Sequence, residues 1–94
     1  MVIGVCTIHL RLPESHSLKE KRGVLKSVLA RLRNEFNVSV AEVGENDLWQ
    51  SATIGAVAVS NDAAYVQGLL ERAVHWIEDH RLDVTVEDYA IELV

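Results

Sequence analysis

The sequence predicts an α+β domain in which two helices pack on one face of a four-stranded antiparallel sheet. Apolar residues recur at helical spacing over Ser17–Asn37, and again from a cap at Asn61 or Asp62 to near His80. Four other stretches are rich in β-branched and apolar residues, which is typical of strands. These strands are expected at Val2–Leu12, Val38–Val43, Leu48–Ser60 and Leu82–Val94. The order βαββαβ is the ferredoxin-like motif, and right-handed crossovers give the strand order 4-1-3-2.

Local signals mark the ends of these elements. Pro13, the only proline, ends the first strand, and the turn residues of Gly44–Asp47 make the second and third strands a hairpin. In the last strand the apolar positions change phase between Val86 and Tyr89. This change predicts a β-bulge or a region buried on both sides.

Length and composition limit the class of protein. The 94 residues are expected to form a single domain over 1–94, and 49% hydrophobic with 24% charged residues is an ordinary soluble composition. One cysteine, Cys6, excludes an internal disulfide and provides too few thiolates for a metal site, and no cofactor is expected. The N-terminal stretch lacks the basic region of a signal peptide, so a cytoplasmic location without membrane contact is expected.

The predicted topology leaves one face of the sheet without helices. If Ala52–Ala58 pack beneath the helices through their even-numbered residues, Val57 and Val59 point the other way and join Ile3 and Val5 on the open face. Exposed aliphatic residues in this number indicate a partner surface. A homodimer through this face or through a strand edge is therefore expected.

The first helix contains a lysine at an apolar position. Ser17 and Glu20 have capping-box spacing. Apolar residues three and four positions apart form a stripe along one side of the helix. Lys21 falls within that stripe, where its stem packs and its ammonium either reaches water or meets a carboxylate. Glu42 is aligned with Val40 on its strand and is expected to point inward near Lys21. The favoured interpretation is a structural ion pair, and the alternative is the floor of an anion site at the helix N-terminus.

A second stripe on this helix is basic. It consists of Lys19, Arg22, Lys26 and Arg33. Residues 16–36 hold six basic and two acidic side chains, net +4, whereas the other residues hold three basic and twelve acidic ones, net −9. The stripe is either a solvated face or a docking surface for a polyanion such as RNA, with Trp49 as a stacking platform for a base.

Several sequence blocks resemble the DUF503, or YlxP-like, family of bacterial proteins. The blocks are Pro13–Ser15, Ser17–Arg22, Phe36–Val43, Asp47, Trp49–Gln50, Ala52, Ile54–Gly55 and Val59–Ser60. The resemblance spans nearly the whole chain and implies a ferredoxin-like fold. Genes of the family often lie near genes for translation initiation and ribosome maturation, which suggests a ribosome-related role. The family has no established catalytic residues to carry over.

The residues themselves nominate no catalytic group. His75 and His80 are five apart, which does not place them on one helix face, and no HExxH, CxxC, P-loop or GxSxG pattern occurs. RNP-type aromatic blocks and a GxxG loop are also absent, so an RNA contact would use the helix and the rim of the sheet. We therefore expect a non-enzymatic protein that binds RNA or the ribosome through the basic stripe. The alternative is a dimeric ligand-binding or regulatory domain with no nucleic-acid role.

Overall fold

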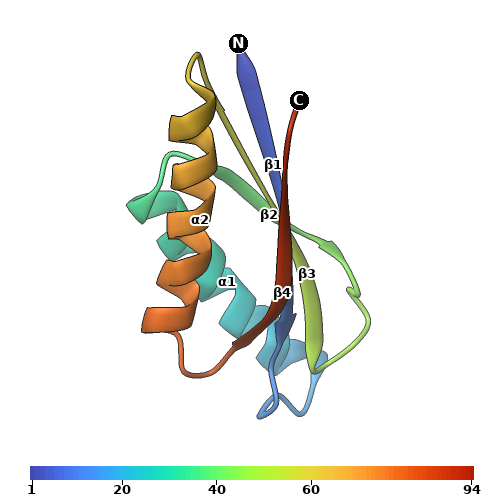
Figure 1. The fold of residues 1–94 in the computed structure, drawn as a ribbon. Helices are drawn as coiled ribbons and strands as arrows, with labels where there is room; N and C mark the ends of the chain where they lie inside the picture. The colour runs from blue at the N-terminus through green and yellow to red at the C-terminus, as the bar shows by residue number, and fades with distance from the viewer.

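The computed structural model describes residues 1–94 as a four-stranded antiparallel sheet with two helices on one face (Figure 1). The strands follow the order β2-β3-β1-β4, which is the predicted order 4-1-3-2 read from the other edge. The ferredoxin-like fold class is therefore confirmed. The elements are β1 Val2–Arg11, α1 Leu18–Glu35, β2 Ser39–Gly44, β3 Ser51–Ser60, α2 Ala63–His80 and β4 Thr85–Leu93.

The core lies between the helices and the two central strands. Alternate residues of β1 and β3 point toward the helices, because side chains on a strand alternate between the two faces. From the strands this layer takes Cys6, Ile8, Leu10, Ala52, Ile54, Ala56 and Ala58, all of which are buried. The helices contribute Leu25, Val28, Leu32, Val66, Leu70, Ala73, Val74 and Ile77.

Gly4 allows α2 to lie close against β1. A Cβ atom at this position would overlap the side chains of Val66 and Leu70, so any larger residue would push the helix away from the sheet. Both chain termini lie at this end of the molecule (Figure 1).

Two strands begin three residues later than predicted, and the other strand ends that differ do so by one residue. The third strand begins at Ser51 and not at Leu48. The Gln50 side chain donates hydrogen bonds to the carbonyl oxygens of Pro13 and Ser15, and its backbone carbonyl oxygen accepts one from the Leu12 amide at 2.9 Å. The fourth strand begins at Thr85 and not at Leu82, since a turn leaves Leu82 98% exposed before the strand starts.

The predicted irregularity in the last strand is a β-bulge. Pairing between β1 and β4 shifts register between His9 and Leu10, so that Glu87 has no opposite residue. A second shift occurs in β2 between Glu42 and Gly44. Both bulges lie in the outer strands of the sheet.

The helix-free face contains the aliphatic residues expected there. Val57 and Val59 are 36% and 57% exposed, and the pairing register places them opposite Val5 and Ile3. Neither α1 nor α2 combines the length and the apolar character that a membrane crossing requires.

Candidate functional site

The N-terminus of α1 has the predicted cap. The Ser17 hydroxyl accepts a hydrogen bond from the Glu20 amide at 3.0 Å, and the Glu20 carboxylate accepts one from the His16 amide at 2.7 Å. These two contacts satisfy backbone donors that have no partner inside the helix. The first turn of α1, which carries Lys19 and Lys21, is thereby held in a defined orientation.

Lys21 lies at the centre of the buried stripe of α1 and is 1% exposed. Its Nζ lies 2.9 Å from Glu42 Oε2 and donates a hydrogen bond to the Glu45 carbonyl oxygen at 2.6 Å. Glu42 Oε2 is buried and accepts no hydrogen bond, so its contact with Lys21 is a charge pairing without hydrogen-bond alignment. Since the ammonium does not reach solvent, the geometry favours the interpretation as a structural ion pair over that as an anion site.

Glu45 connects the two faces of the sheet, and the sequence analysis did not identify it. Its backbone is left-handed, with φ of 59°, which costs a residue other than glycine roughly 1–2 kcal/mol. The carbonyl oxygen accepts from Lys21 on the helix side, whereas Oε1 accepts from the Thr53 hydroxyl at 2.7 Å. His9 Nδ1 lies 3.2 Å from the same hydroxyl. These contacts offset the backbone strain and hold the hairpin loop against the start of α1.

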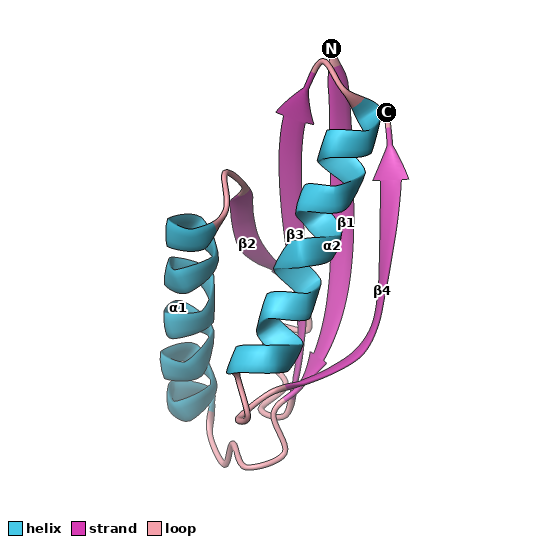
Figure 2. Cartoon of the chain, turned by 60° about the vertical axis from the view of Figure 1, so that its left-hand side comes forward, coloured by secondary structure: helices cyan, strands magenta, loops and turns pink.

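The residues of the basic stripe have different environments. Arg33 donates a hydrogen bond from Nη2 to the Val40 carbonyl oxygen at 2.9 Å, so its guanidinium is engaged with β2. Lys19, Arg22 and Lys26 are exposed, and none of them forms an ion pair. We call these three residues the basic flank. Because Arg33 shares their stripe and reaches β2, the flank runs along the side of α1 that faces the edge of β2 (Figure 2).

Trp49 lies in the loop between β2 and β3 and is 53% exposed. The neighbouring residue, Gln50, bonds the loop that precedes α1, so Trp49 and Lys19 are at the same end of the molecule. Beside Trp49 is a shallow depression of about 370 Å³, lined in part by Arg11 and Asp47. No hydrogen bond or cation–π contact joins Trp49 to the basic flank.

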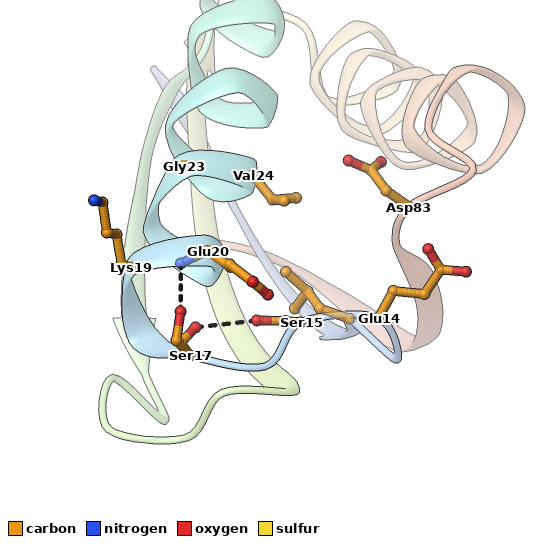
Figure 3. Close-up of a pocket in the computed structure, with 9 residues that line it drawn as sticks. Glu14, Ser15, Ser17, Lys19, Glu20, Gly23, Val24 and Asp83 are labelled. Carbon is orange, nitrogen blue, oxygen red and sulfur yellow. Dashed lines mark hydrogen bonds between the residues drawn. The ribbon is translucent and has the colours of Figure 1, made fainter.

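A larger groove of about 740 Å³ opens beside the first turn of α1. Leu12 and Val24 provide its apolar surface, and three carboxylates lie around it. These are Glu14, Glu20 and Asp83. Figure 3 shows Lys19 directed away from Glu14 and Asp83. Glu14 and Glu20 form no ion pair, whereas Arg81 binds Asp83, so two free carboxylates against one lysine suit a cationic group better than a phosphate.

Asp83 is held at the rim of this groove by Arg81. The guanidinium donates from Nε and Nη2 to the two carboxylate oxygens at 3.0 and 2.8 Å, and these hydrogen bonds lower the pKa of Asp83. Nη1 of Arg81 donates to the Ser27 hydroxyl at 2.8 Å. The connection between α2 and β4 is thus attached to α1.

The groups that could perform chemistry are few. Cys6 is fully buried, and desolvation raises the pKa of its thiol to about 11, so it is not an activated nucleophile. No three His, Cys, Asp or Glu side chains are arranged to hold a metal ion. The best-defined feature of this end of the molecule is the charged surface around the first turns of α1.

Residues 3–91 match the family described as "Protein of unknown function (DUF503)". The chain belongs to the DUF503 family. It is 39% identical over 77 residues to "Uncharacterized protein YlxP" of Bacillus subtilis (strain 168), which covers 82% of this chain and 84% of that protein. Among solved structures, the de novo designed protein Foldit4 is similar with a TM-score of 0.54, at 14% identity, over 100% of this chain and 97% of that one. The likeness to Foldit4 concerns the fold alone.

Proposed function

We propose that this DUF503 protein is a non-enzymatic binding protein that docks on the phosphate backbone of RNA, free or in the ribosome, through its basic flank. The observation that carries the proposal is the freedom of Lys19, Arg22 and Lys26. All three are exposed on one side of one helix without an ion-pair partner, in a chain of net charge −5. Basic side chains without a carboxylate partner keep their charge available for phosphates.

Trp49 adds a second kind of contact to this proposal. An exposed indole can stack on an unpaired base, and such stacking is worth about 1–3 kcal/mol per base. Its loop is attached to the one before α1, at the end of the molecule where the basic flank begins. RNA with single-stranded loops is therefore the expected class of ligand.

The test is a fluorescence-anisotropy titration with a ribosomal RNA hairpin at increasing KCl concentrations. The variant Lys19→Gln/Arg22→Gln/Lys26→Gln is compared with the control Arg31→Gln/Arg72→Gln, which removes two charges outside the basic flank and away from the depression beside Trp49. Each lost phosphate contact should reduce the magnitude of the slope of log affinity against log salt by about 0.7–0.9. The slope of the first variant should therefore be smaller by about 2 than that of the unmodified protein. No binding by the unmodified protein at low salt, or an equal loss in the control, contradicts the proposal.

The groove beside α1 favours a second candidate function, the binding of a small organic cation without any nucleic acid. Its apolar surface and its carboxylates Glu14 and Glu20, which form no ion pair, would accept an amine with a short aliphatic part. A polyamine such as spermidine should then raise the melting temperature, and Glu14→Gln should reduce that effect. An unchanged melting temperature at millimolar spermidine contradicts this candidate.

A further inference from the structure

The strand β4 leaves one edge of the sheet open, and we propose that a second copy of this chain pairs with it through its own β4. β4 has β1 as its only neighbour, and it lies beside α2 without a helix in front of it (Figure 2). No residue between Thr85 and Leu93 is buried.

The hydrogen-bond pattern identifies the backbone groups that face outward. Ile3 and Val94 exchange both of their hydrogen bonds, at 3.1 and 2.7 Å. In an antiparallel ladder such pairs alternate with pairs that do not bond each other. The outward residues of β4 are therefore Tyr89, Ile91 and Leu93, whose N–H and C=O groups point away from β1.

These three residues also carry apolar side chains. Tyr89 and Leu93 are 38% and 43% exposed, and Ile91 is partly buried against the core. All three lie on the helix side of the sheet, because they are opposite the buried residues Ile8 and Cys6 and opposite Gly4. β4 thus presents free backbone groups and an apolar row together, which is what an added strand requires.

Charge decides the register of the pair. A two-fold axis at Ala90 would place Asp88 opposite the partner's Glu92, and an axis at Glu92 would place two glutamates opposite each other. An axis at Tyr89 would bring Ile91 opposite the partner's Glu87, in the bulge. Only an axis at Ile91 avoids all three conflicts within Tyr89–Leu93.

With the axis at Ile91, each residue of the apolar row lies opposite another apolar residue of the partner. Tyr89 lies opposite the partner's Leu93, and Ile91 lies opposite the partner's Ile91. On the other face, Ala90 lies opposite the partner's Glu92, which leaves Glu92 without a like charge directly across the strand. The strand is therefore self-complementary, and this argues for a second copy of the chain as its occupant.

The resulting eight-stranded sheet would leave both copies of α1 at its outer ends, beside β2. The basic flanks then remain accessible, so the pairing neither requires nor excludes the proposed RNA contact. Pairing through β4 can be tested without RNA.

The register can be read by cysteine crosslinking under mild oxidation. Ile91→Cys should form a disulfide dimer rapidly, because opposite Cα atoms lie about 5.5 Å apart. Tyr89→Cys should crosslink slowly, and Leu82→Cys, at a 98% exposed site, measures random collision. Cys6 is fully buried and does not interfere. Crosslinking of Ile91→Cys no faster than that of Leu82→Cys, or faster crosslinking of Tyr89→Cys, overturns the proposal.

Sedimentation of the protein without added cysteines gives an independent readout. A dimer mass at micromolar concentration is expected. The dissociation constant of the dimer should be several-fold lower for Ala90→Lys, which faces the partner's Glu92, and several-fold higher for Ala90→Glu. Ala90 is exposed, so neither change should affect the fold of the monomer. A monomer mass for the unmodified protein, or the same shift for both variants, overturns the proposal.

Discussion

The two edge strands of the sheet deal differently with their unpaired backbone groups. β2 has six residues and a bulge, and Arg33 covers the outward carbonyl oxygen of Val40. β4 has nine residues, and its segment from Tyr89 to Leu93 is regular and uncovered. Short length, bulges and covering side chains protect an edge from unwanted pairing. By these criteria β2 is closed, whereas the C-terminal half of β4 is open.

The two edges also carry opposite charge. The basic flank of α1 lies beside β2, whereas β4 carries Glu87, Asp88 and Glu92. The net charge of −5 conceals this separation, since residues 16–36 alone are net +4. The two proposals assign a different partner to each edge, and the following predictions test how each edge is built.

The largest effect is expected where α1 is joined to β2. Glu42→Gln leaves the Lys21 ammonium buried with only the Glu45 carbonyl oxygen as a partner. Removing one member of a buried ion pair costs about 3–5 kcal/mol, so we expect a loss of about 3 kcal/mol in the free energy of unfolding. Urea denaturation at neutral pH measures it.

The double variant separates the pair from its surroundings. Lys21→Met fills the same apolar site, and in combination with Glu42→Gln it should restore part of the lost stability, with a coupling energy of roughly 1–3 kcal/mol. Additive losses in the single and double variants would show that the 2.9 Å contact between the two side chains does not stabilise the fold.

A smaller effect is expected at the covered edge itself. Arg33→Ala exposes the Val40 carbonyl oxygen, and the loss of one hydrogen bond should cost about 1 kcal/mol. Arg22→Ala is the matched control on the same helix, since Arg22 is exposed and forms no ion pair or side-chain hydrogen bond. If both variants unfold at the same urea concentration as the unmodified protein, Arg33 does not hold the edge of β2.

The smallest effect concerns the turn that leads into β4. The pKa of Asp83 is lowered in the folded state by hydrogen bonds from Arg81, so the contact stabilises the protein above the ordinary carboxyl pKa of about 3.9. This stabilisation is lost as the pH falls through the lowered value. Asp83→Asn should thus reduce stability at pH 7 by less than about 1 kcal/mol, because the carboxylate is 39% exposed, and this loss should become smaller as the pH is lowered toward about 2. An equal loss at both pH values would exclude this linkage.

Helical spacing explains how much of the site could be predicted. Lys21 falls in the apolar stripe at 100° per residue, which predicts a buried stem whose ammonium either reaches water or meets a carboxylate, and strand alternation places Glu42 inward near it. The capping of α1 by Ser17 likewise depends on residues three apart in the sequence. Alternation along the strands places Val57 and Val59 on the open face for the same reason.

Contacts between distant segments could not be predicted in this way. The bond from Arg33 to β2 depends on how far α1 extends along the sheet, and spacing places Arg33 with Lys19, Arg22 and Lys26 without distinguishing them. The left-handed backbone at Glu45 has no local signal, since the neighbouring Gly44 or Asn46 would adopt it more readily. Trp49 was expected at the start of a strand, but contacts of the adjacent Gln50 keep it in the loop.

Amide hydrogen exchange followed by NMR at two protein concentrations compares the two edges most directly. We expect the outward amides of Tyr89, Ile91 and Leu93 to become more protected at the higher concentration, because a second β4 covers them. The outward amides of Val40 and Glu42 in β2 should exchange at the same rate at both concentrations. Concentration-dependent protection in β2, or its absence in β4, would contradict the conclusion that β2 is the closed edge and β4 the open one.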